Sequence, residues 1–371
     1  MNTERKPPWR RTTNHLIFVS IIVVAIIFTY GYMRLRIFHV PPIDWQAGRG
    51  TGETAVEVNS TDHHTSREHA NKSTPLRAHF SAQLLDKLGD LRDGFTGTLK
   101  PHEKPVVPNI AHYIWFSCHP FEFENLLSLI SVHRFMRAEK ILFHTDCEPS
   151  GQWWKEARKI PSLEILQREP VKTIFGRNIN PIWPEHQSDV ARLQILMEYG
   201  GIYFDTDIFV LKSLEPLRYY DYVVGRQTSD GLNNGIILAS KDSEFLRVFY
   251  ESYRNYKPSC YSCISIKYHN DLAKEHQHLV HIENYSLVQP NFDKWRTIFY
   301  GKFDWPDNHY TIHLWIKQYK NKHKGFSFNS ENIKSLDTAF GEMCRYIYYG
   351  TSDLIQTNAT ELFEWWSNAT S

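Results

Sequence analysis

The sequence carries almost no net charge, because 42 lysines and arginines offset 41 aspartates and glutamates to leave +1. A chain with this balance has no general electrostatic attraction for nucleic acid or for a strongly acidic partner. The sequence also shows no internal repeat. The remaining composition is that of an ordinary globular protein, and 371 residues suffice for one large domain or two small ones.

Cysteine is scarce, and its odd count leaves at least one thiol free or paired with another chain. Cys260 and Cys263 form a lone C-x-x-C motif, which without a second pair nearby is a poor zinc site. A local disulfide, or two cysteines without a special role, is the better interpretation. The five cysteines are Cys118, Cys147, Cys260, Cys263 and Cys344.

Charge is absent from one long apolar run, which extends from Leu16 to Met33 and is just long enough to span a bilayer as a helix. Four basic residues precede this run and two follow it closely, which favours a cytoplasmic N-terminus. The sequence therefore predicts a tail at 1–15 and a transmembrane signal anchor at 16–33. A cleaved signal peptide is the alternative, although no small-residue cleavage site follows Met33.

Apolar clusters are few in residues 34–105, where Gly, Thr, Ser, His, Pro and charged residues dominate. This composition predicts a luminal stem. Sequons for N-glycosylation fit a luminal body, since all of them lie C-terminal to the predicted anchor. The acceptor asparagines are Asn59, Asn71, Asn284, Asn358 and Asn368.

Strand and helix patterns alternate from residue 106 onward, which predicts an α/β domain with a parallel sheet covered on both faces. Ligands of such sheets bind beyond the carboxyl ends of the strands. The expected strands are 108–117, 138–146 and 162–167, and the expected helices are 121–136 and a segment around 151–159.

Residues 186–201 predict a helix, because apolar residues recur at helical spacing and Gly200 suits its C-terminal end. Ser188 or Asp189 is expected to cap its start. Asp189 and Arg192 are three residues apart and therefore share one face of this helix. A capping aspartate with a surface arginine is the alternative interpretation.

A short apolar segment, GIYF (201–204), predicts a buried strand that leads into Asp205-Thr206-Asp207. Alternation in an extended chain places both carboxylates on one side and Thr206 on the other. Two converging carboxylates repel each other unless a cation lies between them. Hard divalent cations take oxygen ligands and keep positions open for phosphate oxygens. The motif therefore predicts a divalent metal site, with a diphosphate beyond the metal.

Other uses of Asp-x-Asp are less consistent with this sequence. An EF-hand loop is excluded, because position twelve counted from Asp205 is Pro216 instead of glutamate. A haloacid-dehalogenase-like phosphatase would use Asp205 as its nucleophile, but that motif normally opens its domain and continues into a Gly-Thr turn. Two acids on a solvated turn remain the simplest alternative.

The combined pattern resembles glycosyltransferase family 32. S-D-x-x-R, an apolar helix, G-G-I-Y-F-D-T-D and V-L-K-S-L are similar to the family's DXD sugar-binding region. PNIAHYIW (108–115) resembles its opening strand, and YTIHLW (310–315) resembles its late His-x-Trp segment. The family includes α-1,4-galactosyltransferases, α-1,4-N-acetylglucosaminyltransferases and fungal initiating mannosyltransferases. The resemblance implies a retaining glycosyltransferase with a GT-A, Rossmann-like catalytic domain at 106–320 and a C-terminal extension at 321–371.

The resemblance also implies roles for the metal and donor residues. Asp207 would bind Mn²⁺ or another divalent cation directly, and His313 would complete its shell or contact a phosphate. Asp205 would contact the ribose or sugar of the donor and help to position the cation. Asp189 would accept hydrogen bonds from donor sugar hydroxyls, and Arg192 would reach the sugar or diphosphate.

Four further positions match the family less specifically. Tyr203 would line the donor pocket, and Trp115 would stack on the nucleobase, with a core tryptophan as the alternative. Asn234 would face the donor sugar and acceptor, unless Asn233-Asn234-Gly235 is a plain turn. If residues 313–317 (HLWIK) are helical, Lys317 would lie on the same face as His313 and would steady the leaving diphosphate.

The resemblance implies a UDP-sugar donor, UDP-galactose or UDP-N-acetylglucosamine, and an acceptor glycan on a glycolipid or glycoprotein. With the anchor, it implies a type II protein of the Golgi membrane. Residues 255–300 depart from the galactosyltransferase pattern and are expected to determine the acceptor. A silent, membrane-anchored sugar-binding protein is the remaining alternative.

Overall fold

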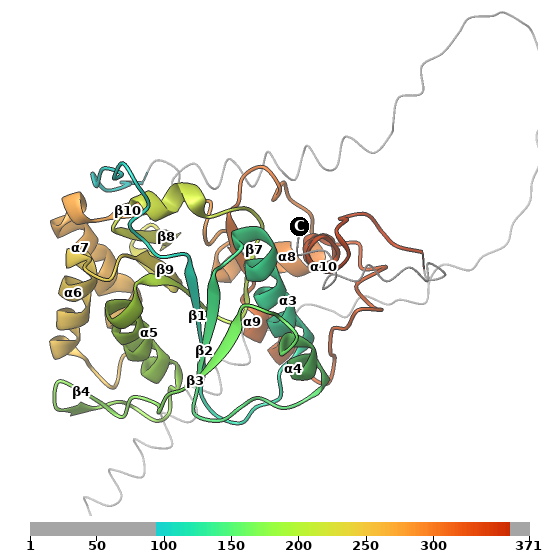
Figure 1. Cartoon of the computed structure of the whole chain (residues 1–371), viewed down its shortest axis with the longest axis horizontal. Coiled ribbons are helices and arrows are strands. Elements are labelled where there is room, and N and C mark those ends of the chain that lie inside the picture. Colours follow the sequence, from blue (N-terminus) through green and yellow to red (C-terminus); the bar gives the residue numbers. More distant parts are fainter. Residues whose placement is uncertain (1–93, 357–371) are drawn as a thin grey trace, which may run out of the picture. The chain divides into compact units, whose positions relative to one another are not determined.

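The computed structural model describes residues 94–356, which form a sheet with helices packed on both of its faces (Figure 1). The predicted tail, signal anchor and most of the predicted stem lie outside the described residues. Within residues 94–356, no helix is both long and apolar enough to cross a membrane.

The strand and helix patterns of the sequence appear as regular elements, most of them shorter than expected. The strands are β1 Ile110–Trp115, β2 Lys140–Thr145, β3 Leu163–Gln167, β4 Thr173–Ile174, β5 Arg177–Asn178, β6 Gly201–Phe204, β7 Ile208–Val210, β8 Tyr222–Thr228, β9 Gly231–Ala239, β10 His281–Glu283 and β11 Thr311–His313. The helices are α3 Phe123–Ser131, α4 Gln152–Ala157, α5 Glu185–Tyr199, α6 Glu244–Glu251, α7 His269–Glu275, α8 Trp295–Tyr300, α9 Ile316–Lys322 and α10 Ala339–Tyr349.

The main sheet has seven strands in the order β10-β8-β9-β6-β1-β2-β3. β6, β1, β2 and β3 are parallel neighbours, as the alternating pattern predicted. The predicted parallel sheet is confirmed only in part, because β9 runs antiparallel to both β6 and β8. A tight connection from β8 to β9 allows this reversal, since antiparallel neighbours need no helical crossover.

Successive side chains of the central strands point to opposite faces of the sheet and pack into two separate hydrophobic cores. On one face, α3, α4, α8 and α10 pack in a cluster that includes Ile202 and Phe204 of β6. On the other face, α5, α6 and α7 pack in a cluster that includes Tyr203 of the same strand. α10 lies inside the first cluster, so residues 339–349 of the expected C-terminal extension are an integral part of the described domain.

The domain begins before residue 106, where the sequence placed the end of the stem. The amide of Thr98 donates to the carbonyl of Gln277 over 2.7 Å, and the amide of Ile282 donates to Thr96 over 2.8 Å. The guanidinium of Arg226 lies 4.8 Å from the ring of Phe95. Residues 94–105 lack apolar periodicity, so the sequence carries no signal for these contacts with the domain.

The structure pairs four cysteines and buries the fifth. Cys118 bonds Cys147, Cys260 bonds Cys263, and Cys344 is free and buried. The local C-x-x-C disulfide is therefore confirmed.

The sequon at Asn284 does not offer an accessible acceptor in the fold. The side chain is buried, donates to the carbonyl of Gly94 over 2.6 Å and accepts from Arg226 over 2.7 Å. A glycan on this buried nitrogen would require the residues that cover it to move. The other four sequons lie outside the described residues.

A pair of buried histidines lies beneath the glycines that precede the Asp-x-Asp segment. His112 of β1 and His144 of β2 approach within 3.2 Å, and the Nε2 atom of His112 lies 2.7 Å from the carbonyl of Gly200. Gly201 has a φ of 108°, and a Cβ there would lie 2.6 Å from the carbonyl of Ile110 and 2.9 Å from His112. The tight turn between α5 and β6 therefore requires glycine.

We expect Gly201→Ala to destabilise the fold more than Gly176→Ala. Both glycines have positive φ, but a Cβ at Gly176 meets nothing within 4 Å. Backbone strain costs each variant about 1–2 kcal/mol, and overpacking costs Gly201→Ala about 1–3 kcal/mol more. Urea unfolding of the two variants measures the difference, and equal stabilities would contradict this account of the turn.

We expect the free energy of unfolding to fall as the pH drops from 6.5 towards 4. Burial lowers the pKa of His112 to about 4. Burial, with the positive charges of His112 and Arg168, lowers the pKa of His144 to about 3. Between these values and 6.5 the unfolded chain binds protons that the folded chain does not, so stability is lost on acidification by up to about 1.4 kcal/mol per pH unit for each histidine.

His112→Gln tests this expectation, because the glutamine amide can still donate to Gly200 but does not titrate. Unfolding free energies measured at several pH values should fall less steeply with acidification in the variant. Parallel pH profiles for the two proteins would show that His112 is not the source of the dependence.

Candidate active site

The Asp205-Thr206-Asp207 turn is held from behind by a polar stripe on α3, formed by Asn125, Ser128 and Ser131. The Asn125 amide donates to the carbonyl of Thr206 over 3.2 Å, and the Ser128 hydroxyl donates to the carbonyl of Ile208 over 2.6 Å. The hydroxyl of Ser131 accepts from the amide of Val210 over 2.9 Å. Because buried backbone groups need partners, these three side chains fix the path of the chain between β6 and β7.

His313 reaches this turn through a second, two-stranded sheet. β11 pairs antiparallel with β7, and His313 lies opposite Ile208 in the register. Just beyond β11, the amide of Leu314 donates to the carbonyl of Asp207, and the amide of Ile316 donates to its Oδ2 atom over 3.1 Å. A segment about a hundred residues away in the sequence thus contacts both the backbone and the side chain of Asp207.

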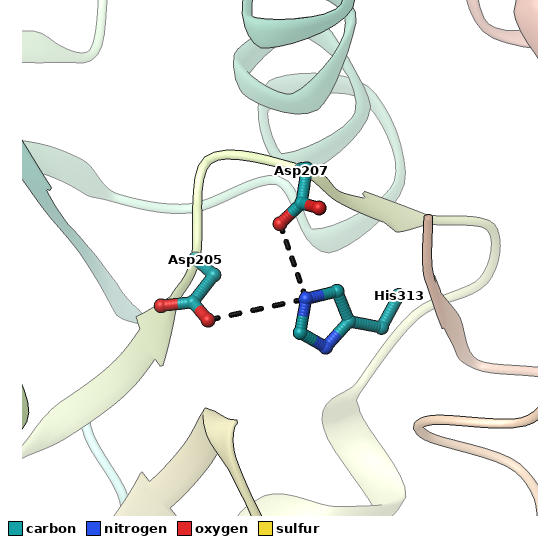
Figure 2. Close-up of side chains that lie close together, drawn as sticks. All are labelled: Asp205, Asp207 and His313. Atoms are coloured by element: carbon teal, nitrogen blue, oxygen red, sulfur yellow. Dashed lines mark ion pairs between the residues drawn. The ribbon is translucent and has the colours of Figure 1, made fainter. Parts of the chain in front are cut away.

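The side chains of Asp205, Asp207 and His313 converge (Figure 2). One ligand atom from each lies within 4.8 Å of the other two. The Nε2 atom of His313 is 3.2 Å from Asp207 Oδ1 and 4.0 Å from Asp205 Oδ2. Two carboxylate oxygens and an imidazole nitrogen at this spacing form a set that fits a divalent cation such as Mn²⁺.

The charges of Asp207 and His313 stabilise each other. Burial would raise the pKa of Asp207, but His313 and the amide of Ile316 outweigh it and lower that pKa. Burial would lower the pKa of His313, but the negative charge of Asp207 outweighs it and raises that pKa. A cation bound between these groups would take the place of the imidazolium charge.

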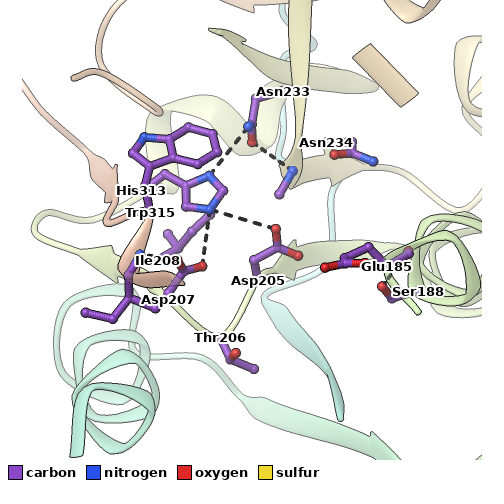
Figure 3. A network of polar contacts seen from close by, with 12 residues as sticks. Glu185, Ser188, Asp205, Thr206, Asp207, Ile208, Asn233, Asn234, His313 and Trp315 are labelled. Carbon is purple, nitrogen blue, oxygen red and sulfur yellow. Dashed lines mark hydrogen bonds and ion pairs between the residues drawn. The ribbon is translucent and has the colours of Figure 1, made fainter. Parts of the chain in front are cut away.

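Gly235 of β9 leaves the space that this cluster occupies. A Cβ at this position would lie 2.6 Å from Asp205 Oδ2, 2.9 Å from His313 Cε1 and 3.0 Å from Asn233 Oδ1. Asn233 is in turn held by its own contacts, since its Oδ1 accepts from the amide of Gly235 and its Nδ2 donates to Gln227. Figure 3 shows Asn233 beside the imidazole of His313.

Asp189 and Arg192, both buried, form a second group beside the cluster together with the half-buried Asn234. Arg192 Nη2 lies 3.1 Å from Asp189 Oδ1, and the amide of Asn234 donates to the same oxygen over 2.7 Å. The arginine also donates to the backbone carbonyl of Asn234. The expected cap at Ser188 or Asp189 was wrong, because α5 begins at Glu185 and both residues lie within its first turns.

Arg192 connects the two groups through Asp205. Its Nη1 atom lies 3.3 Å from Asp205 Oδ1, which also accepts a hydrogen bond of 2.7 Å from the Tyr203 hydroxyl. Its guanidinium lies 4.4 Å from the centre of the Tyr203 ring. Burial would lower the pKa of Arg192, but Tyr203, Asp205 and Asp189 outweigh it and raise that pKa. The arginine therefore stays charged where it balances the carboxylates.

These residues line one cavity of about 640 Å³. This volume is in the usual range for small-molecule sites. Its lining is Ile114, Glu185, Ser188, Asp189, Arg192, Tyr203, Asp205, Thr206, Asp207, Gln227, Asn233, Asn234, Tyr261, Ser262, Ser265, Ile266, Phe292, His313, Trp315, Ile316, Lys317 and Gln318.

Two residues predicted for the donor site lie differently from expectation. Trp115 does not line the cavity: its ring centre is 5.2 Å from that of Phe121 in the core, because alternation along β1 turns its neighbour Ile114 to the cavity instead. Lys317 does line the cavity, but not on a helix shared with His313. It belongs to α9, and its Nζ atom lies 2.7 Å from Glu185 Oε1.

Several residues of the site were missed in the sequence. The stripe of α3 was visible as polar residues at every third position of an apolar helix, a pattern that signals buried hydrogen bonds. Gln227, Tyr261 and Phe292 had no comparable signal, since each reaches the cavity from a different segment of the chain.

We expect Gly235→Ala to weaken Mn²⁺ binding about tenfold or more, because its methyl group would separate Asp205 from His313. Gly301→Ala is the matched control, since its methyl group would lie near Thr297 O, outside the cavity lining. Titration calorimetry with Mn²⁺ measures both. Equal Mn²⁺ affinity in Gly235→Ala and the parent protein, or no Mn²⁺ binding by the parent, would contradict a metal site here.

Comparison with known proteins bears on this geometry. Residues 132–224 match the family model described as "Glycosyltransferase sugar-binding region containing DXD motif". This segment contains Asp189, Arg192 and the Asp205-Thr206-Asp207 turn. The resemblance to DXD glycosyltransferases is thus confirmed for the part of the chain that supplies these residues to the cavity.

Two curated relatives are an enzyme named for glucan organisation and a mannosyltransferase. The chain is 28% identical over 197 residues to glucan organizing enzyme 1 of Cryptococcus neoformans, a match that covers 48% of this chain and 53% of that protein. It is 38% identical over 60 residues to inositol phosphoceramide mannosyltransferase 3 of Schizosaccharomyces pombe, covering 16% and 17%. The chain thus spans about half the length of the first relative and less of the second.

Among solved structures, the galactosyltransferase LgtC in complex with donor and acceptor sugar analogues is similar at 11% identity. The match covers 67% of this chain and 98% of that one, with a TM-score of 0.36.

Proposed function

We propose that this chain, whose residues 132–224 match the sugar-binding region of DXD glycosyltransferases, transfers a hexose or N-acetylhexosamine from a nucleotide sugar to a glycan acceptor. One observation carries the proposal. Asp205, Asp207 and His313 converge in the same cavity as the Asp189–Arg192 pair, so a cation site lies beside groups that bind hydroxyls and phosphates. By resemblance, the donor is UDP-galactose or UDP-N-acetylglucosamine.

The position of the Asp-x-Asp turn in the sheet supports the proposal of a GT-A fold for this domain. The Asp-x-Asp turn follows β6, at the carboxyl end of a strand that lies parallel to β1. This is the edge of an α/β sheet where ligands bind. The second sheet, β7 with β11, then brings His313 to the same edge.

Asp207, His313 and Asp205 would hold Mn²⁺, whose charge neutralises negative charge on the departing diphosphate. Arg192 supplies a permanent positive charge on the same side of the cavity and fixes Asp205 by their contact of 3.3 Å. Both described contacts of the Asp189 carboxylate use Oδ1, which leaves Oδ2 for a donor sugar hydroxyl.

Retention of configuration is the stereochemical part of the proposal, and the ion pairs of the cavity support it. Each of the four carboxylates in the described lining, Glu185, Asp189, Asp205 and Asp207, lies in an ion pair with a basic residue. None is therefore an unpaired general base for an acceptor hydroxyl. In a front-face reaction the leaving phosphate takes that proton, and no such base is needed.

The phosphatase interpretation is not favoured by this geometry. A nucleophilic Asp205 would need a free oxygen directed at a phosphorus atom. Instead, Oδ1 accepts from Tyr203 and faces Arg192, while Oδ2 faces His313. A silent sugar-binding protein would retain the cavity without turnover, and the experiment below separates it from an enzyme.

We further propose that the catalytic domain is luminal and anchored in the Golgi membrane by residues 16–33. The uncharged run and the basic residues before it support this topology. The acceptor, a glycan of a glycolipid or glycoprotein, would then meet the enzyme in the same compartment.

The test offers the full chain a panel of nucleotide sugars with Mn²⁺ and follows release of nucleoside diphosphate. We expect one donor to be hydrolysed, and we expect Asp207→Asn to lower that rate at least a hundredfold by removing a metal ligand. Asp242→Asn is the matched control, because Asp242 is an exposed surface aspartate outside the cavity.

Release that depends on Mn²⁺ and on Asp207 would identify the enzyme class and the sugar. Nucleotide-sugar binding without release from any donor would favour the silent binder. Metal-dependent phosphate release from simple esters, lost in Asp205→Asn, would favour the phosphatase.

A further inference from the structure

Two exposed aromatic side chains lie at the cavity. Tyr261 is 50% exposed and Phe292 is 46% exposed, and both belong to the lining that includes Asp205. Large hydrophobic side chains with this exposure elsewhere in residues 94–356, such as Tyr300 and Phe326, do not line it. Exposed aromatic rings in a polar cavity are an unfavourable arrangement unless a ligand covers them.

Tyr261 is held in place from three directions. The disulfide between Cys260 and Cys263 encloses it, and its carbonyl accepts a hydrogen bond of 2.9 Å from Nε2 of the buried His186. Its ring centre lies 5.6 Å from that of Trp183 in an edge-on contact. The ring is therefore positioned before any ligand arrives, which lowers the entropy cost of binding.

Tyr261 lines the same cavity as the groups that would hold the donor. His186 lies one turn before Asp189 on α5, so the hydrogen bond to Tyr261 joins the disulfide loop to the donor helix. Burial raises the pKa of the Tyr261 hydroxyl, and the negative charges of Glu185 and Asp189 raise it further. The phenol thus lies within electrostatic range of the carboxylates of the cavity.

The segment of the lining that contains Tyr261 is itself uncharged. Residues 261–266 read Tyr-Ser-Cys-Ile-Ser-Ile, and besides the Tyr261 ring they contribute the apolar side chain of Ile266 and the hydroxyls of Ser262 and Ser265 to the lining. Phe292 adds a second ring, which packs edge-on against Trp315 with centres 6.2 Å apart. An uncharged wall with rings and hydroxyls complements a neutral molecule that has both an apolar face and hydroxyl groups.

The charged part of the cavity is already assigned to the donor. An acceptor must reach the donor sugar from the remaining lining, which is the wall that contains Tyr261 and Phe292. A pyranose ring has the required chemistry, since its C–H groups pack on aromatic rings while its hydroxyls bind Ser262 and Ser265.

We propose that Tyr261 and Phe292 form the acceptor subsite and bind a neutral sugar ring, with the Cys260–Cys263 disulfide positioning Tyr261. This inference rests on the proposed function, because it uses the donor assignment to locate the acceptor. It adds the chemical class of the acceptor group that lies next to the reaction centre. That group is a neutral sugar ring, and a charged sugar is excluded from this position.

A binding experiment tests the subsite without requiring turnover. The full chain in lipid nanodiscs is mixed with methyl glycosides of glucose, galactose, mannose and N-acetylglucosamine, and saturation transfer to their ring protons is recorded by NMR. We expect transfer to at least one glycoside, its loss in Tyr261→Ala, and its retention in Tyr261→Phe. Tyr300→Ala, which removes a similarly exposed ring outside the cavity, should leave transfer unchanged.

A kinetic experiment tests the role of the disulfide. With the donor identified above, we expect Tyr261→Ala and the double variant Cys260→Ser/Cys263→Ser to raise the KM for the best glycoside about three- to tenfold. The KM for the donor should change by less than the acceptor KM in both variants, because the proposed donor groups belong to other segments of the chain. Such a difference between the two KM values would not arise from a general loss of folding.

The outcomes separate this inference from the proposed function. Turnover of a donor with an acceptor KM that is unchanged in Tyr261→Ala would overturn the subsite and leave the transferase intact. Binding of no methyl glycoside by the parent protein would also overturn it. Glycoside binding that depends on Tyr261, without turnover of any donor, would support the subsite while removing the transferase function.

Discussion

Repulsion between the carboxylates of Asp205 and Asp207 is the constraint around which this domain is arranged. Both lie at the end of a buried strand, where water screens their charges poorly. A basic side chain lies beside each carboxylate: Arg192 is 3.3 Å from Asp205, and His313 is 3.2 Å from Asp207. A divalent cation between the carboxylates would balance them more completely, which is why the arrangement favours a metal site.

The positive groups come from distant parts of the fold, so the fold has to bring them together. Arg192 belongs to α5 on one face of the main sheet, and His313 belongs to β11, which pairs with β7 beyond the other end of the turn. The polar stripe of α3 then holds the turn in place. The absence of a side chain at Gly235 leaves the space that Asp205 and His313 occupy. Burial makes each of these contacts costly to lose, because breaking one leaves a buried polar group with one partner fewer and no water to replace it.

Much of this arrangement was predictable where the relevant residues are close in the sequence. Asp189 and Arg192 share a helix face because they are three residues apart, and their ion pair of 3.1 Å follows. Predictions that depended on the direction of a single side chain were less successful. Trp115 lies one position from Ile114, yet alternation sends it into the core and Ile114 to the cavity. Lys317 failed as a helical neighbour of His313 because Trp315, with a φ of 56°, separates strand from helix.

By itself, the sequence determined the order of strands and helices, the glycine turn and the Asp-x-Asp segment, because these depend on local periodicity, backbone freedom and adjacent charges. Only the tertiary structure decided that β9 reverses direction, that His313 meets Asp207, and that Tyr261 faces the same cavity from a disulfide loop. These contacts join residues from roughly thirty to more than a hundred positions apart, and their energies depend on a shared burial that no single segment can indicate.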